Sequence, residues 1–200
     1  MRILVIGKNG QLGKSINKIV TLANGGCHDF IFADKNVLNL GNKGDINYYF
    51  DNNSRFDVIV NCAAYTAVDS AEQEMVEANQ INNLAVRQIA KIAKSHQTRL
   101  IHISTDFVFD GKSSQPYTEV DTPNPINVYG RSKFAGEESL REVMLKGAII
   151  IRTSWLYSEY NRNFVKTILK LGREKSELSV VKDQIGSPTY ATDLAEVILG

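Results

Sequence analysis

The chain has 200 residues, of which 43% are hydrophobic and 22% are charged, with 23 basic and 22 acidic side chains. This composition can build one sizeable core and excludes a disordered chain, and a net charge of +1 gives no electrostatic basis for binding nucleic acid or an anionic membrane. The two cysteines, Cys27 and Cys62, fit neither a disulfide scaffold nor a zinc site, so no metal is expected. With no apolar run long enough for a signal peptide or a membrane span, we expect a cytoplasmic protein.

Short apolar runs alternate with amphipathic patterns along most of the chain. The runs predict buried strands at Arg2–Ile6, Phe30–Ala33, Val58–Asn61, Leu100–Ile103 and Ala148–Ile151. Apolar residues at helical spacing predict helices over Gln11–Thr21, Asp45–Phe50, Glu74–Ser95 and about Val128–Lys146. Because strands that alternate with helices form right-handed βαβ units, we expect an α/β protein. Its fold would be a Rossmann-type, doubly wound parallel sheet with helices on both faces.

The pattern changes after Arg152. We expect a helix over Phe164–Lys175, a strand over Leu178–Val181, turns over Asp183–Tyr190, and a last helix that begins at Thr192 or Asp193. That helix needs an apolar surface to pack against, so the sequence favours a fragment or a shortened relative of a longer protein.

A glycine-rich turn joins the first strand to the first helix. Gly7 permits a sharp turn, Gly10 lets a pyrophosphate approach, and Gly13 lets the helix pack closely against the strand. The free N–H groups and the dipole of the helix start favour phosphate charge. The GxxGxxG spacing is typical of short-chain dehydrogenases/reductases and predicts dinucleotide binding; the alternative is a tight turn with incidental glycines.

Two charged residues end the second strand. Asp34 stands 21 positions after Gly13, where an acid accepts hydrogen bonds from an adenosine ribose, and Lys35 can meet a 2′-phosphate. The pair leaves NADPH and NADH both open as the cofactor. A solvated strand end is the alternative for both residues.

A candidate catalytic set lies further along the chain. Tyr129 and Lys133 are four residues apart on one helix face, where a lysine cation is expected to lower the tyrosine pKa and Tyr129 can pass a proton to a substrate oxygen. Ser104, Thr105 and Asp106 follow the fourth strand, and a hydroxyl there can polarise a carbonyl. This order of motifs predicts a nicotinamide-dependent oxidoreductase. The alternatives are an exposed Tyr/Lys pair and hydroxyls that only cap a turn.

With these residues, the chain resembles the dTDP-4-dehydrorhamnose reductase family of extended short-chain dehydrogenases/reductases. The matching motifs are residues 7–13, 57–69, 104–111, 125–133, 152–157 and 183–189. The resemblance implies NAD(P)H-dependent reduction of the C4 ketone of dTDP-4-dehydro-L-rhamnose to dTDP-L-rhamnose, with a proton from Tyr129, in polysaccharide biosynthesis. The alternatives are another nucleotide-sugar reductase or epimerase, a non-catalytic NADP-binding regulatory subunit, and an inactive remnant.

The resemblance also implies roles for individual residues. The catalytic residues would be Thr105, Tyr129 and Lys133. Substrate contacts would come from Val68, Thr105, Asp106 and Trp155, although Val68 and Trp155 also suit core packing. Together with the residues inferred above, the expected cofactor contacts are Gly7, Gly10, Gln11, Leu12, Gly13, Asp34, Lys35, Asn39, Leu40, Ala63, Ala64, Thr66, Tyr129 and Lys133.

The sequence departs from the family at a few points. Asn39 and Phe107 stand where many members carry Asp and Tyr, and Gln11–Thr21 lacks the acidic residues of magnesium-linked dimers. We expect an NAD(P)-binding Rossmann domain over residues 1–152 and a partial substrate-binding region over 153–200, with a nucleotide sugar as the partner and a homodimer left open. No residue stands at a spacing from His102 that would indicate a functional partner, so we expect it to be a core or edge side chain of its strand.

Overall fold

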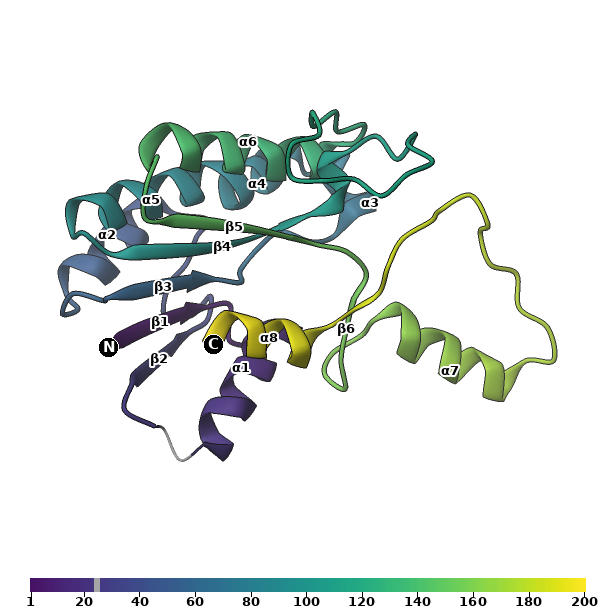
Figure 1. The fold of residues 1–200 in the computed structure, drawn as a ribbon, viewed down its shortest axis with the longest axis horizontal. Helices are drawn as coiled ribbons and strands as arrows, with labels where there is room; N and C mark the ends of the chain where they lie inside the picture. The colour runs from purple at the N-terminus through teal and green to yellow at the C-terminus, as the bar shows by residue number, and fades with distance from the viewer. Residues whose placement is uncertain (24–25) are drawn as a thin grey trace.

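Five parallel strands form the central sheet in the order β2-β1-β3-β4-β5. The computed structural model describes residues 1–23 and 26–200. The strands are β1 (Arg2–Ile6), β2 (Asp29–Ala33), β3 (Val58–Asn61), β4 (Arg99–Thr105) and β5 (Ala148–Thr153) (Figure 1). The strand order reverses at β1, and ligands of such sheets bind at the carboxyl ends of the strands beside that point. The predicted fold class is confirmed.

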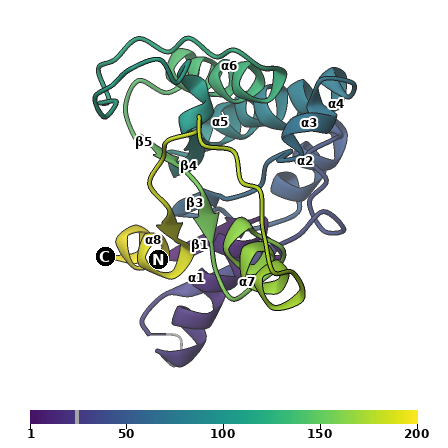
Figure 2. The same ribbon diagram turned by 90° about the vertical axis from the view of Figure 1, so that its right-hand side faces the viewer.

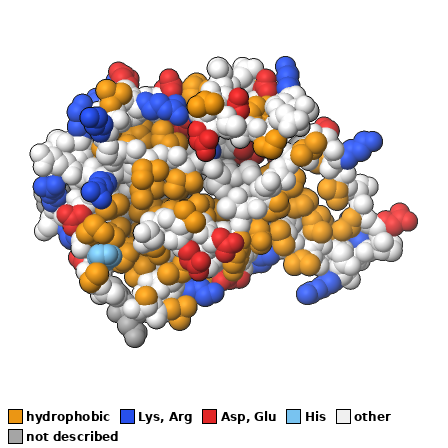
Figure 3. All heavy atoms as spheres, in the orientation of Figure 1, with side chains coloured by type: hydrophobic (Ala, Val, Ile, Leu, Met, Phe, Trp, Pro, Cys, Tyr) orange, Lys and Arg blue, Asp and Glu red, His pale blue; other side chains and the backbone are white. Residues whose placement is uncertain are grey.

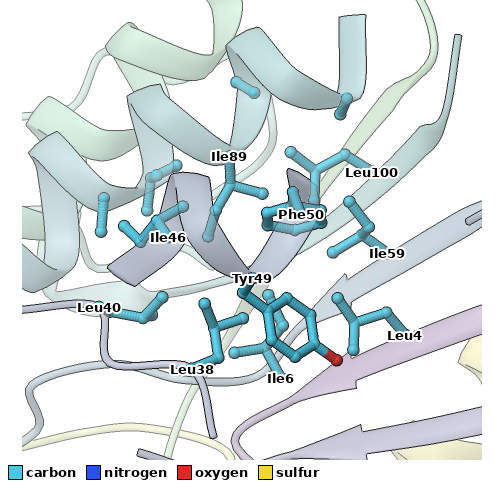
Figure 4. Close-up of a cluster of buried hydrophobic side chains, with 14 of the residues drawn as sticks. Leu4, Ile6, Leu38, Leu40, Ile46, Tyr49, Phe50, Ile59, Ile89 and Leu100 are labelled. Atoms are coloured by element: carbon cyan, nitrogen blue, oxygen red, sulfur yellow. The ribbon is translucent and has the colours of Figure 1, made fainter. Parts of the chain in front are cut away.

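Helices cover both faces of the sheet (Figure 1). Because side chains alternate along a strand, Leu4 and Ile6 point to one face while Ile3 and Val5 point to the other. The first face carries the cluster shown in Figure 4, in which strand residues meet α2 (Lys43–Asp51), α5 (Ala85–Ser95) and α6 (Val128–Val143). On the second face lie α1 (Gln11–Leu22) and α8 (Ala191–Leu199).

The second face is covered only in part. Ile149 of β5 is 58% exposed, and Ile101, Ile103 and Ile151 are half-buried beside it. Figure 3 shows hydrophobic side chains gathered over this part of the sheet.

The last helix does have a packing partner, because Leu194 and Ala195 of α8 lie in one apolar cluster with Leu12 and Ile16 of α1. No helix in the described part of the chain is long and apolar enough to cross a membrane.

The long helix predicted over Glu74–Ser95 is interrupted. It consists of α4 (Met75–Asn79), a π-helical turn over Gln80–Leu84, and α5. In that turn the buried Asn82 donates to Ser132 Oγ at 2.9 Å, and a Cβ on Gly136 would lie 2.0 Å from the Asn82 carbonyl oxygen. The predicted helix is therefore confirmed in extent, and the π-helical turn within it, which contacts α6, is a feature that the apolar stripe does not reveal.

The C-terminal part differs most from its prediction. The helix α7 (Phe164–Glu174) is present, but Leu178–Val181 forms no strand. A two-residue strand β6 (Leu156–Tyr157) instead pairs with β7 (Thr189–Tyr190), and both were unforeseen. The views in Figures 1 and 2 place α7 beyond the carboxyl ends of the sheet strands. The strand prediction is wrong because Val180 and Val181 line a cleft instead of pairing.

Candidate active site

A cleft of about 1020 Å³ opens at the carboxyl ends of β1, β3 and β4. Its walls also include the short helix α3 (Val68–Ala71) and the start of α7. All the predicted site residues except Gly13 line this cleft, although they come from segments spread between Gly7 and Trp155. A cleft of this volume is large enough for a dinucleotide or a nucleotide sugar.

The glycine turn has the geometry of a phosphate cradle. Gly7 adopts φ +91°, and a Cβ there would lie 2.8 Å from the Ala63 backbone nitrogen. A Cβ on Gly13 would lie 2.3 Å from the Gly7 carbonyl oxygen, so Gly13 permits close packing below the cleft. Within the described residues no side chain caps the start of α1, and its first turn holds no acidic residue. The N–H groups of this turn therefore suit a pyrophosphate.

The end of the cleft at Asp34 contains an ion pair that the sequence did not suggest. Lys8 Nζ lies 3.1 Å from Asp34 Oδ2, and Asn9 Nδ2 donates to the same oxygen at 3.2 Å. The hydrogen bond from Lys8 is the main reason that the pKa of Asp34 lies below its ordinary value. Lys35 lines the cleft beside them. The partner of Asp34 is therefore Lys8, a residue of the glycine turn whose role only its spatial position reveals.

The part of the cleft beside Leu38 and Leu40 is largely apolar. Leu38 and Leu40 line it, with Ala63 and Ala64 across the cleft. Asn39 also lines it, but its side chain is used within the fold: Oδ1 accepts from the Gly41 N–H at 3.0 Å.

Tyr129 lies in the first turn of α6, which Asn127 caps by accepting from the Gly130 N–H at 2.7 Å. Tyr129 is 9% exposed, and the Phe107 ring packs edge-on against its ring at 5.5 Å between centroids. Burial raises the pKa of Tyr129, and the Thr105 hydroxyl opposes only part of that effect. The phenol therefore stays protonated at neutral pH.

Lys133 is almost fully buried and its amine points into β4. Nζ donates to the Ile103 carbonyl oxygen at 2.7 Å and lies 3.3 Å from His102 Nε2. Burial lowers the pKa of Lys133 to about 8, although Glu137 acts in the opposite direction. The prediction that Lys133 lowers the pKa of Tyr129 is wrong, because burial of the phenol dominates and the amine is directed to β4.

Ser104 and Thr105 belong to β4, which continues through both residues, whereas Asp106 begins the 3-10 turn that follows. Thr105 Oγ1 donates to Asp106 Oδ1 at 3.0 Å and accepts from the Phe107 N–H at 3.2 Å. Thr105 thus caps the 3-10 turn that follows and also lines the cleft. Burial raises the pKa of Asp106.

Trp155 forms part of the outer wall. It adopts φ +47°, a strained value for an aromatic residue, and remains 38% exposed, so it is not a core residue. Its indole lies against Gly186 and 6.2 Å from the Phe164 ring. Val68, across the cleft, is half-buried and packs against an apolar cluster while lining the cleft.

The C-terminal segment adds cleft residues that the sequence did not predict. They are Leu156, Tyr157, Asn161, Arg162, Asn163, Phe164, Val165, Val180, Val181, Gln184 and Pro188. The buried Thr153 hydroxyl, also in the lining, has no hydrogen-bond partner among the described residues. Periodicity could not identify these residues because they lie in or beside loops.

Comparison with known proteins gives a consistent result. The family model of the RmlD substrate binding domain matches residues 1–200. The dTDP-4-dehydrorhamnose reductase of Aggregatibacter actinomycetemcomitans is 42% identical over 198 residues, which are 99% of this chain and 66% of that protein. The chain thus spans about two thirds of the length of the curated relatives that it matches.

Two solved structures show the same similarity. A dTDP-4-dehydrorhamnose reductase of Clostridium acetobutylicum superposes with a TM-score of 0.93 at 40% identity, covering 100% of this chain and 69% of that one. The dTDP-4-dehydrorhamnose reductase of Bacillus anthracis, solved in complex with NADP, superposes with a TM-score of 0.91 at 42% identity. The match covers 99% of this chain and 69% of that one. The chain therefore belongs to the RmlD family, the family of the dTDP-4-dehydrorhamnose reductases.

Proposed function

We propose that this chain binds NADPH or NADH and reduces the C4 ketone of dTDP-4-dehydro-L-rhamnose to dTDP-L-rhamnose. The observation that carries the proposal is that one cleft contains the glycine turn, Thr105, Tyr129 and Lys133. Residues 1–152 would bind the cofactor, and residues 153–200 would supply one wall of the substrate site.

On this proposal the protein holds the cofactor along the strand ends. The N–H groups at the start of α1 bind the pyrophosphate, and Asp34 accepts a hydrogen bond from the adenosine ribose. When bound, the nicotinamide supplies the hydride that reduces the ketone. Lys133, whose Nζ donates to the Ile103 carbonyl oxygen of β4, would lie at the nicotinamide end of the cofactor.

Tyr129 supplies the proton. Its burial keeps the phenol protonated, which suits a group that must donate to the C4 oxygen as that oxygen becomes an alcohol. Thr105 is the neighbouring hydroxyl that orients the carbonyl, while Val68, Asp106 and Trp155 form the sugar contacts. The position of each side chain in the cleft and the family to which the chain belongs support these roles.

The test separates binding from turnover. NADPH oxidation with dTDP-4-dehydro-L-rhamnose is measured for the wild-type chain and for Tyr129→Phe, and the NADPH Kd is measured for both by fluorescence. We expect turnover to fall by about a hundredfold or more in Tyr129→Phe, since general acid catalysis contributes that much, with little change in Kd. Tyr48→Phe, at a residue that is 71% exposed on α2, is the control and should leave both unchanged.

Three other outcomes would contradict the proposal. Tight NADPH binding without turnover would indicate a cofactor-binding subunit or a chain whose substrate site is incomplete. Turnover of a different nucleotide sugar in its place would assign another reductase. Absence of binding of both NADPH and NADH would exclude the dinucleotide site itself.

A further inference from the structure

A carboxylate from another segment holds the first residue of α6. Glu72 directly follows α3, and its Oε1 accepts from the Val128 N–H at 2.8 Å. Val128 begins α6, so its N–H is one of those that no carbonyl of the helix can reach. Tyr129 is the next residue, and this bond therefore holds the backbone that carries the phenol. The mechanism above does not use Glu72.

The bond also links two elements of the cleft wall. The helix α3 begins with Val68, which lines the cleft, and Glu72 stands at the other end of that helix. Ala71, the last residue of α3, shares one apolar cluster with Val128 and Tyr129, and Val68 packs against the same cluster. The bond from Glu72 to Val128 thus fixes how Tyr129 stands relative to Val68.

Two other contacts of this turn cannot replace the bond. Asn127 accepts from the Gly130 N–H at 2.7 Å, but it belongs to the same turn and moves with it. Phe107 packs tightly against the turn, since a Cβ on Gly130 would lie 2.2 Å from the Phe107 carbonyl oxygen. That contact limits how closely the turn can approach but does not attract it. Glu72 is the residue from a distant segment that supplies the attraction at Val128.

The next turn of α6 has anchors of its own. Asn82 donates to Ser132 Oγ at 2.9 Å, and Lys133 Nζ donates to the Ile103 carbonyl oxygen at 2.7 Å. Loss of the Glu72 bond should therefore loosen the first turn and leave the rest of the helix in place.

We propose that Glu72 is a positioning residue that anchors the first turn of α6 and so directs the Tyr129 phenol toward the substrate carbonyl. The proposal rests on the proposed function, in which Tyr129 donates the proton. Proton transfer needs donor and acceptor atoms about 2.6–3.2 Å apart, and a displacement of about 1 Å can lower the rate by about a hundredfold. Because Glu72 is an exposed residue, its replacement removes no core packing.

The first experiment uses NMR on the chain without substrate. In Glu72→Ala we expect the Val128 amide, which loses its acceptor, to exchange its hydrogen about tenfold faster. We also expect weaker Overhauser contacts between the rings of Tyr129 and Phe107, whose centroids are 5.5 Å apart. Glu72→Gln keeps an oxygen that can accept from Val128, so it should restore both signals. Glu77→Ala, at an exposed residue of α4, is the matched control and should change neither.

The second experiment measures turnover with NADPH and dTDP-4-dehydro-L-rhamnose. We expect kcat to fall by about tenfold in Glu72→Ala and to recover in Glu72→Gln, with the NADPH Kd unchanged. A residue with only a structural role would lower the Tm and leave the kcat of the folded protein as it was, and that result would overturn the proposal.

A third variant, Val128→Pro, removes the same hydrogen bond from the donor side. Proline suits the first position of a helix, and Asn127 before it is already extended, with φ −123° and ψ 167°. Adding Glu72→Ala to Val128→Pro should therefore cause no further loss of kcat, whereas fully additive losses would overturn the proposal.

Unchanged Val128 exchange or unchanged ring contacts in a folded Glu72→Ala protein would also overturn the proposal. If Glu72→Ala does not fold, the ring contacts of Tyr129 in Val128→Pro decide in its place. Because the NMR signals need no substrate, failure of this inference is distinguishable from failure of the proposed function.

Discussion

Gln11 Oε1 accepts a hydrogen bond from Asn163 Nδ2 at 2.9 Å, joining residues that are 152 positions apart. The same oxygen accepts from Ser158 Oγ at 2.8 Å, and Gln11 Nε2 donates to the Leu156 carbonyl oxygen at 3.0 Å. The glycine turn is thus fastened to the segment that leads into α7. Because the Gln11 side chain is engaged in these bonds, any contact of this residue with a pyrophosphate falls to its backbone N–H.

Replacing Gln11 with alanine should loosen this junction. Each lost hydrogen bond is worth about 1 kcal/mol, so we expect amide hydrogen exchange over residues 156–165 to accelerate by about tenfold or more, with β1 unaffected. Asn17→Ala, at an exposed position of α1, is the control. Equal exchange in both variants would show that the hydrogen bonds of Gln11 do not hold this segment in place.

The buried carboxylate of Glu137 should make stability depend on acid pH. Burial alone would raise its pKa, but the hydrogen bonds from Arg152 and the nearby Arg141 outweigh burial, so the pKa lies below the ordinary 4.5. A lowered pKa in the folded state means that the stabilisation is present above about pH 4.5 and is lost as the pH falls through the folded-state pKa.

Glu137→Gln therefore tests this ion pair. We expect the free energy of unfolding at pH 7 to fall by about 3 kcal/mol, because the half-buried Arg152 loses the fully buried carboxylate that is its counter-charge. In urea titrations at pH 4 and below, the free energies of unfolding of the variant and the wild type should lie closer together than at pH 7. Glu138→Gln, whose carboxylate is 57% exposed, should cost less than about 1 kcal/mol. If the difference in the free energy of unfolding between variant and wild type stays constant with pH, stability does not depend on the protonation of Glu137.

Gly186 should determine the position of the Trp155 indole. A Cβ at residue 186 would lie 2.9 Å from the indole Cε2 and 3.0 Å from Nε1, so Gly186→Ala must displace one or the other. Trp155 is the only tryptophan of the chain, so its fluorescence maximum and acrylamide quenching report the shift directly. Gly172→Ala on α7, where a Cβ meets nothing within 4 Å, is the matched control. Identical spectra for both variants would refute this packing.

Asp34 should influence the choice between NADPH and NADH. Its carboxylate repels a 2′-phosphate and accepts from a ribose hydroxyl, whereas Asp34→Asn would leave Lys8 without its ion-pair partner. We expect the ratio of the NADH Kd to the NADPH Kd to rise by about tenfold in Asp34→Asn. Titration of both nucleotides at fixed ionic strength measures the ratio, with the exposed Asp51→Asn as control. An unchanged ratio of the two Kd values would show that the adenosine ribose does not bind beside Asp34.

The sequence by itself determined the five strands of the sheet and most of the helices that cover it. Apolar runs and helical spacing are local signals, and they hold wherever an element buries one whole face. The glycine turn and the strand-end residues Asp34 and Thr105 were predictable for a related reason: the parallel order of the strands brings their carboxyl ends to one edge.

Only the tertiary structure decided how polar groups are paired. Asp34 meets Lys8, Lys133 meets His102, and Gln11 meets Asn163, and none of these pairs follows from spacing in the sequence. The π-helical turn at Asn82 and the exposed position of Trp155 likewise depend on contact with distant segments. Hydrogen bonds and burial act between neighbours in space, and this is why the pKa values of Tyr129 and Lys133 could be assigned only once the fold had set their surroundings.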